Sequence, residues 1–399
     1  MALEVLGFAI AGCVLGVFTG LFPGIHTNTV ALAALGFPSL GNRNIIVFVA
    51  SMSVVHTFVD FVPSILFGAP SGETFLGVLP GHRMLLQGKG LEAVRLSAVG
   101  GVFAGLASLL LSPVFLLSLE RISGIMHAFV PIALTAILGF MLLDEGKEGF
   151  LWAGMVVALS ALLGMLALKS NLVVKEPLLC LASGFFGAST LVDSILKNPK
   201  FVEQKEEVFA FGKGTALKGS FLALLGGWVV SLLPGIGASQ AAFIVRKLAG
   251  RIEDRVYLIL LGGTNTSTMI LSFFVLFAWG KTRTGSAASL SQLGAFGLPE
   301  LGLVVGAVLL AIGFGAAATG TVAKKATGIL KKIDYRKLNI AVLFFVSAIV
   351  IAFSGFLGMA FYAIACLVGL VAVNSKTKRG NCMAFLMVPT IIHYFSGFV

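Results

Sequence analysis

The stretch Gly20-Leu-Phe-Pro-Gly-Ile-His-Thr-Asn-Thr29 places a Pro-Gly-Ile break inside a long apolar run that carries no formal charge. Proline removes a backbone hydrogen-bond donor and glycine relaxes the chain, so the pair interrupts a helix. In a bilayer, an opened backbone is tolerated only where it faces protein or a watery cavity. This break is therefore the first candidate for a functional centre.

A second break of the same kind lies in the other half of the chain, in Ser231-Leu-Leu-Pro-Gly-Ile-Gly-Ala-Ser-Gln240. Matching interruptions in two halves are the best sequence indication of a transporter's substrate site. We therefore expect two transmembrane repeats, residues 1–196 and 219–399, joined by a polar linker at 197–218. Repeats of inverted topology would bring the two breaks together near the bilayer midplane.

The composition is that of a membrane protein. Of 399 residues, 58% are hydrophobic and only 11% are charged, whereas soluble domains carry about 25% charged residues. A membrane-spanning helix needs about 20 apolar residues, and runs of that length recur along the whole chain. The sequence predicts an all-α polytopic membrane protein with about ten to twelve transmembrane helices, some of them discontinuous. One such division is expected near Ser354-Gly355.

The formal net charge of +11 is concentrated in loops, so it indicates membrane orientation and lipid contact rather than a nucleic-acid partner. The positive-inside rule places three clusters, Arg246–Arg255, Lys324–Lys337 and Lys376–Arg379, on the cytoplasmic side of the cell membrane. The acidic turn Asp144–Glu148 is then expected outside. The four cysteines are scattered without metal-ligand spacing, so no metal site and no bound cofactor are predicted.

Each break exposes the start of a half-helix, whose unpaired N–H groups and positive dipole end bind carboxylate or phosphate. The alternative is a plain proline kink, or a helix capped by Thr27 or Ser239. Taking the first view, the residues predicted to bind substrate are Pro23, Gly24, Ile25, His26, Thr27, Asn28, Thr29, Pro234, Gly235, Ile236, Gly237, Ser239, Gln240 and, in a later polar run, Asn265. His26 is either a proton carrier or anion ligand, or a neutral histidine bonded to backbone.

Ionisable groups at membrane depth are costly and usually functional. Asp60 follows His56 by one helical turn, and we expect the two to pair. Asp60, His56 and Thr266 are the candidates for binding a coupling ion, Na⁺ or a proton; a purely structural role for Asp60 is the alternative. Lys281 and Arg283 lie at the corresponding place in the second half, where they would either attract anions or anchor the chain at the interface.

Read together, these motifs resemble the large membrane subunit of the tripartite tricarboxylate transporters. That family has a Pro-Gly turn in each half and a further Pro-Gly segment in the first, which here reads Ile65-Leu-Phe-Gly-Ala-Pro-Ser-Gly-Glu-Thr74. The resemblance spans roughly Gly16–Leu96 and Gly226–Thr268. It implies that Pro70, Ser71 and Gly72 also lie near the substrate, and that the partners include a solute-binding protein and a small membrane subunit. This chain departs from the family in carrying His26 where glycine is usual.

The leading function is secondary transport of a di- or tricarboxylate-like organic anion by alternating access. The second is translocation of a polyprenyl phosphate or another anionic lipid, since the paired Pro-Gly-Ile turns are also similar to those of such translocases. An intramembrane hydrolase using His26, Asp60 and Ser71 is the third. An enzyme is not expected, because no Gly-x-Ser-x-Gly, His-Glu-x-x-His or Gly-x-Gly-Asp motif occurs. Because no Gly-x4-Gly-Lys-Ser/Thr phosphate loop occurs, ATP is not expected to drive transport directly.

Overall fold

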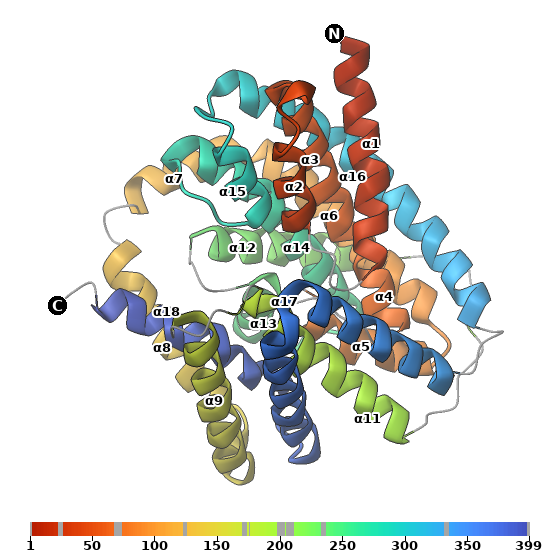
Figure 1. The fold of residues 1–399 in the computed structure, drawn as a ribbon, viewed down its shortest axis with the longest axis vertical. Coiled ribbons are helices and arrows are strands. Elements are labelled where there is room, and N and C mark those ends of the chain that lie inside the picture. Colours follow the sequence, from red (N-terminus) through yellow and green to blue (C-terminus); the bar gives the residue numbers. More distant parts are fainter. Residues whose placement is uncertain are drawn as a thin grey trace.

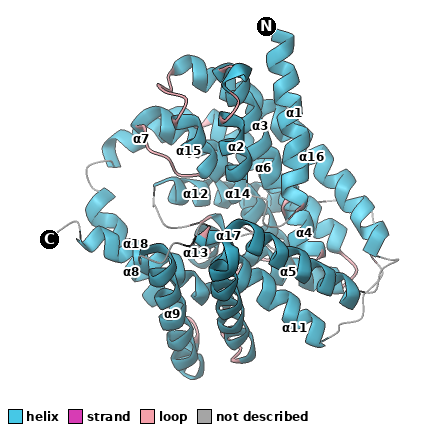
Figure 2. Cartoon of the chain, viewed as in Figure 1, coloured by secondary structure: helices cyan, strands magenta, loops and turns pink. Residues whose placement is uncertain are grey.

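The structure is a computed structural model that describes residues 2–22, 27–67, 74–122, 126–169, 174, 176–197, 204, 211–232, 237–330 and 335–396. Across these residues the chain forms helices joined by turns, with no strand (Figure 2). Nine of the helices in these ranges are long and apolar enough to cross a membrane, and a shorter apolar helix covers Pro131–Leu143. The prediction of an all-α polytopic membrane protein is therefore confirmed.

The first half of the chain contains eleven α-helices among its described residues, and the π-helical turn Ser183–Ala188 joins the last two. The helices are α1 Ala2–Leu21, α2 Thr27–Leu35, α3 Asn42–Val59, α4 Phe61–Leu66, α5 Phe75–Leu86, α6 Gly90–Leu110, α7 Ser112–Ile122, α8 Met126–Leu143, α9 Gly146–Lys169, α10 Pro177–Ala182 and α11 Ser189–Lys197.

The second half contains helices α12 to α18, and a short 3-10 turn at Arg379–Met383 precedes the last helix. Their bounds are α12 Lys213–Leu232, α13 Ala238–Leu248, α14 Asp254–Trp279, α15 Gly285–Ser291, α16 Leu298–Leu330, α17 Tyr335–Asn374 and α18 Ala384–Ser396. The predicted division of α17 is present, because Gly355 leaves the helical region with φ 68° and ψ −170°. Only glycine adopts this conformation readily, so the kink is encoded locally.

Helix α1 runs in the same direction as α3, and glycines allow the two backbones to approach closely. A Cβ placed on Gly12 would lie 2.3 Å from the carbonyl oxygen of Phe48, and one on Gly20 would lie 3.2 Å from that of His56. Residues later in α1 therefore contact residues later in α3, so the two helices run in parallel. Since α1 and α3 are parallel, the short helix α2 between them must turn back, and the first Pro-Gly-Ile break lies in the sequence between α1 and α2.

The second half repeats this arrangement. Gly219 of α12 lies against Ile259 of α14, and Gly227 of α12 lies against Ser267 of α14, so these two helices are also parallel. Helix α13 returns between them. The run from Gly219 to Val245 thus turns back on itself, and the second break lies in the sequence between α12 and α13.

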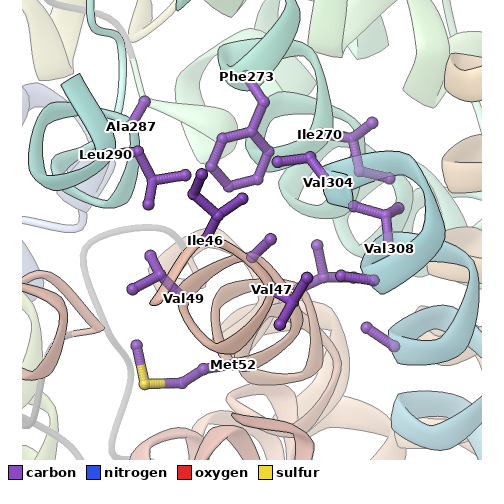
Figure 3. Close-up of a cluster of buried hydrophobic side chains, with 14 of the residues drawn as sticks. Ile46, Val47, Val49, Met52, Ile270, Phe273, Ala287, Leu290, Val304 and Val308 are labelled. Carbon is purple, nitrogen blue, oxygen red and sulfur yellow. The ribbon is translucent and has the colours of Figure 1, made fainter. Parts of the chain in front are cut away.

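The two repeated units run in opposite directions. Along α3, Asp60 contacts Asn265 and Thr57 contacts Thr266, and further back Ile46 lies in the same apolar cluster as Phe273 of α14 (Figure 3). Residues later in α14 therefore contact residues earlier in α3, so the two helices run antiparallel. This antiparallel crossing of equivalent helices has the inverted topology that the paired breaks predict.

Helices α3 and α14 form the centre of the larger of two bodies. Helix α14 is buried along its whole apolar stretch, and α3 nearly so. The large body comprises α1–α7 and α12–α16, and the small body comprises α8–α11, α17 and α18. Among the described residues, every extensive contact between two helices joins helices of the same body. Figure 1 shows α8, α9, α17 and α18 gathered below α12 and α14 in that view. Each half of the chain contributes to both bodies.

The apolar run Leu96–Leu119 is divided between two helices, because α6 ends at Leu110 and α7 begins at Ser112, just before Pro113. One expectation from the sequence was wrong. The turn at Asp144 is not across the membrane from Lys376–Arg379, because Lys378 Nζ lies 2.6 Å from Asp144 Oδ2. A direct ion pair requires both turns to be on the same side.

Candidate functional site

The first break lies beside the polar end of α3. Gly20, three residues before Pro23, packs against the carbonyl oxygen of His56 and the backbone nitrogen of Asp60. His56 Nδ1 lies 3.1 Å from Thr19 Oγ1, which ties the α1 side of the break to α3. His56 and Asp60, the two ionisable groups that the sequence singled out here, thus lie beside the last turn of α1, just before the first break.

Asp60 is buried at the point where α3 passes into α4, with 4% of its surface exposed. Its Oδ2 accepts a hydrogen bond from Asn265 Nδ2 over 3.1 Å, and Asn265 is equally buried near the middle of α14. Burying a carboxyl group is costly unless its oxygens are hydrogen-bonded, so the amide of Asn265 is a required partner. The contact joins a candidate residue from each half of the chain.

A second polar contact lies next to the first. Thr57 Oγ1 and Thr266 Oγ1 are 3.0 Å apart, and both residues are buried. Carboxylate, amide and hydroxyl oxygens at the crossing of α3 and α14 are hard ligands of the kind that small cations bind in proteins. In the described part of the chain, no group of three or more His, Cys, Asp or Glu residues is arranged to hold a metal ion.

The second half-helix starts at Thr27 for the first hairpin and at Ala238 for the second. Thr27 Oγ1 accepts a hydrogen bond from Ser286 Oγ over 3.3 Å, and Ser286 also contacts Ser53 Oγ at 2.7 Å. Ser239 is fully buried at the start of α13. Thr27 is therefore held by the segment that follows α14 rather than by its own helix alone.

One short segment contacts the flanks of both breaks. Arg283 Nη2 reaches the carbonyl oxygen of Leu232, the last residue of α12, at 3.5 Å, while Ser286 binds Thr27. Arg283 and Ser286 are three residues apart, which limits their Cα separation to about 11 Å. The end of α12 and the start of α2 are therefore gathered around the turn between α14 and α15.

Ten of the predicted residues lie outside the described ranges, namely Pro23, Gly24, Ile25, His26, Pro70, Ser71, Gly72, Pro234, Gly235 and Ile236. Asn28, Thr29 and Gln240 lie in described helices, α2 and α13, but their side chains are not described. Gly237 directly precedes α13. Of the remaining predicted residues, Asp60, Asn265 and Thr266 come together, with His56 one turn away on α3.

The structure adds partners that the sequence did not single out, namely Thr19, Ser53 and Ser286. All three are hydroxyl residues inside apolar or small-residue segments, where such residues commonly bond their own helix, as Thr19 does to Gly16. Sequence spacing does not distinguish a hydroxyl that bonds within its helix from one that reaches another helix. Only the contact between distant segments reveals them.

Two inverted hairpins, interrupted at their tips and crossing around buried polar groups, define a polytopic membrane transporter. The chain belongs to the tripartite tricarboxylate transporter TctA family, whose model matches residues 6–384. Members of this family are the large subunits of tripartite transport systems, and the family is one of transporters rather than enzymes.

A curated relative from Methanocaldococcus jannaschii, described as the uncharacterized protein MJ1079, is 28% identical over 401 residues. The alignment covers 98% of this chain and 99% of the relative, so the similarity extends over the whole protein. No solved structure matches the chain.

Proposed function

We propose that this protein transports a di- or tricarboxylate anion by alternating access, with the anion bound between the two hairpin tips. The observation that carries the proposal is the Asp60–Asn265 hydrogen bond, which lies where α3 and α14 cross and beside the first break. Family membership supports a tricarboxylate-like substrate. Half-helix starts at Thr27 and Ala238 would supply N–H groups to the carboxylates.

Coupling is assigned to the polar groups at this crossing. An anion with several charges needs compensating positive charge to cross the bilayer, and Na⁺ or a proton at Asp60 would provide it. Thr57 and Thr266, within hydrogen-bond distance of each other, offer further oxygen ligands for Na⁺. His56 would act with Asp60 if the coupling ion is a proton.

Movement of the large body against the small body would provide the alternation. Contacts between the bodies include Phe22, which follows α1 immediately before the first break, and Phe345 of α17, whose ring centroids are 5.7 Å apart. Leu232, before the second break, packs against the apolar core of the small body. The described residues directly before each break therefore lie at the surface along which the two bodies would slide.

In this scheme the chain is a cell-membrane subunit with Arg246–Arg255, Lys324–Lys337 and Lys376–Arg379 in the cytoplasm. Because Asp144 pairs with Lys378, the turn at Asp144 is assigned to the cytoplasmic side as well. An extracytoplasmic solute-binding protein and a small membrane subunit would deliver the anion and complete the complex, as in the family.

A ligand screen on the purified full-length protein tests the proposal. Thermal stability should rise with citrate, succinate or a related carboxylate, in a concentration-dependent manner, because a ligand that binds only the folded state stabilises it. Stabilisation by a polyprenyl phosphate and by none of the carboxylates would instead support lipid-phosphate translocation. Uptake of the stabilising anion into proteoliposomes under Na⁺ or proton gradients then identifies the coupling ion.

A further inference from the structure

The turn between α14 and α15 contains an arginine whose surroundings are unusual for a structural residue. Arg283 is half-buried, and its guanidinium contacts two partners, the carbonyl oxygen of Leu232 and the hydroxyl of Tyr394 on α18. Neither partner is charged. Among the described residues, no carboxylate forms an ion pair with Arg283, although buried arginines are normally paired.

The guanidinium also retains an unused donor. Arg283 Nε is buried without a hydrogen-bond partner, and the contact to Leu232 is long, at 3.5 Å. Next to Leu232, Ser231 Oγ is a second fully buried polar atom without a partner. Each such atom is costly, so an open donor on Arg283, and a second one residue before its partner Leu232, point to an acceptor that binds beside the end of α12.

The position of Arg283 connects it to transport. It contacts the last residue of α12, directly before the second break, and its neighbour Ser286 contacts the helix that starts after the first break. Tyr394 belongs to the small body, so Arg283 lies at the boundary between the two bodies. Burial lowers the pKa of Arg283, while Tyr394 raises it, and an arginine remains charged under these conditions.

We propose that Arg283 is the residue that recognises the negative charge of the transported anion, by donating hydrogen bonds from its guanidinium to a carboxylate held beside the end of α12. This assignment rests on the proposed function. The planar fork of arginine matches a carboxylate in a bidentate arrangement, which a lysine does not reproduce. The start of α13, at Ala238, would supply backbone N–H groups to the same anion.

A purely structural role makes a different prediction. As a cation at the C-terminal end of α12, Arg283 would stabilise the exposed carbonyls and the helix dipole. Its loss would then lower the stability of the protein without any ligand and leave the affinity for anions unchanged. Binding and stability therefore have to be measured separately.

The test compares Arg283→Gln with Lys281→Gln in the purified full-length protein, using citrate, succinate and acetate as probes. Lys281 is an exposed cation two residues away, whose ammonium lies over the Trp279 ring, so this variant removes the same charge without touching the break. Arg283→Gln should weaken citrate binding about tenfold or more, with a smaller loss for acetate, because a charge-assisted pair is removed. Lys281→Gln should bind citrate like the unsubstituted protein.

Arg283→Lys provides a second variant in case the glutamine variant does not fold. It keeps the positive charge at the end of α12 but lacks the planar guanidinium that can bind a carboxylate in a bidentate arrangement. The affinity for citrate should therefore fall, while the stability of the ligand-free protein is retained. Citrate binding that is unchanged in both Arg283 variants overturns the assignment of Arg283 alone. Absence of binding of all three carboxylates by the unsubstituted protein overturns the proposed function, and this assignment with it.

Discussion

Asp60 and Asn265, from opposite halves of the chain, are joined by a 3.1 Å hydrogen bond in the buried centre of the large body. Both residues belong to helices that lie next to a broken hairpin of their own half. The bond therefore links the two repeats at the place where their equivalent helices cross. Under the proposed function, Asp60 is the group of this pair that would respond to a coupling ion.

Replacing Asp60 with asparagine should abolish the dependence of uptake on the coupling gradient. The variant keeps the size of the side chain and its oxygen acceptor, but it can neither carry a proton nor supply a charged ligand to Na⁺. Proteoliposome uptake with and without an imposed gradient measures the effect. Gradient-driven uptake at the unsubstituted level would exclude Asp60 from coupling.

Replacing Asn265 with alanine should destabilise the protein, since it removes a hydrogen bond to a buried carboxyl group worth about 1.5–3 kcal/mol. The double variant Asp60→Ala with Asn265→Ala should cost less than the sum of the two single changes, because each of them removes the same hydrogen bond. Thermal unfolding in detergent of the four proteins gives the coupling energy. Strictly additive effects would show that the two side chains do not interact in solution.

Gly16→Ala should destabilise the α1–α3 packing by about 1–3 kcal/mol, because the new methyl group overpacks a close backbone contact. A Cβ on Gly16 would lie 2.5 Å from the carbonyl oxygen of Met52. Gly7→Ala in the same helix is the matched control, since a Cβ there meets nothing within 4 Å. Equal melting temperatures for the two variants would contradict the close approach of α1 and α3.

Linking the two bodies should stop transport while leaving anion binding intact. Cysteines at Phe22 and Phe345, joined by a short bifunctional thiol reagent, would tie the first hairpin tip to α17. Cysteines at Arg83 and Asp254, whose side chains form an ion pair within the large body, provide the control. Uptake should fall only in the first linked variant; uptake that persists there would rule out movement between the bodies.

The turns at Asp144 and Lys378 should be modified from the same side of the membrane. Single cysteines at Lys147 and Lys376, two exposed positions near these turns, can be tested with a membrane-impermeant thiol reagent in oriented vesicles. The reagent should reach both from one side. Labelling of the two positions from opposite sides would contradict the ion pair between the turns.

Much of this architecture could be predicted from the sequence, because its signals are local. Apolar runs of sufficient length indicated the spans, and glycine at position 355 indicated the kink in α17. The Pro-Gly-Ile pair placed one hairpin tip in each half. The polar run Thr264–Thr268 indicated Asn265 and Thr266 as candidates, and Asn265 contacts Asp60 at the end of α3 while Thr266 contacts Thr57 of α3.

What the sequence could not provide were the relationships between distant segments. The contact of Asp60 with Asn265 and that of Ser286 with Thr27 depend on how α3, α14 and α15 pack, which no spacing along the chain encodes. The division into two bodies could not be predicted from the sequence either, because each body contains helices from both halves of the chain. The side of the membrane on which the Asp144 turn lies was predicted wrongly, because the distribution of charge along the chain does not reveal that Asp144 pairs with Lys378.

The sharing of helices between the bodies has a consequence for either half of the chain on its own. If one half were expressed alone, it would hold part of each body and complete neither, leaving the apolar sides of helices such as α3 without α14 and α16 to cover them. A protein made of one half alone would consequently need a second half inserted in the opposite orientation before either body is complete. Joining both halves in one polypeptide removes that requirement.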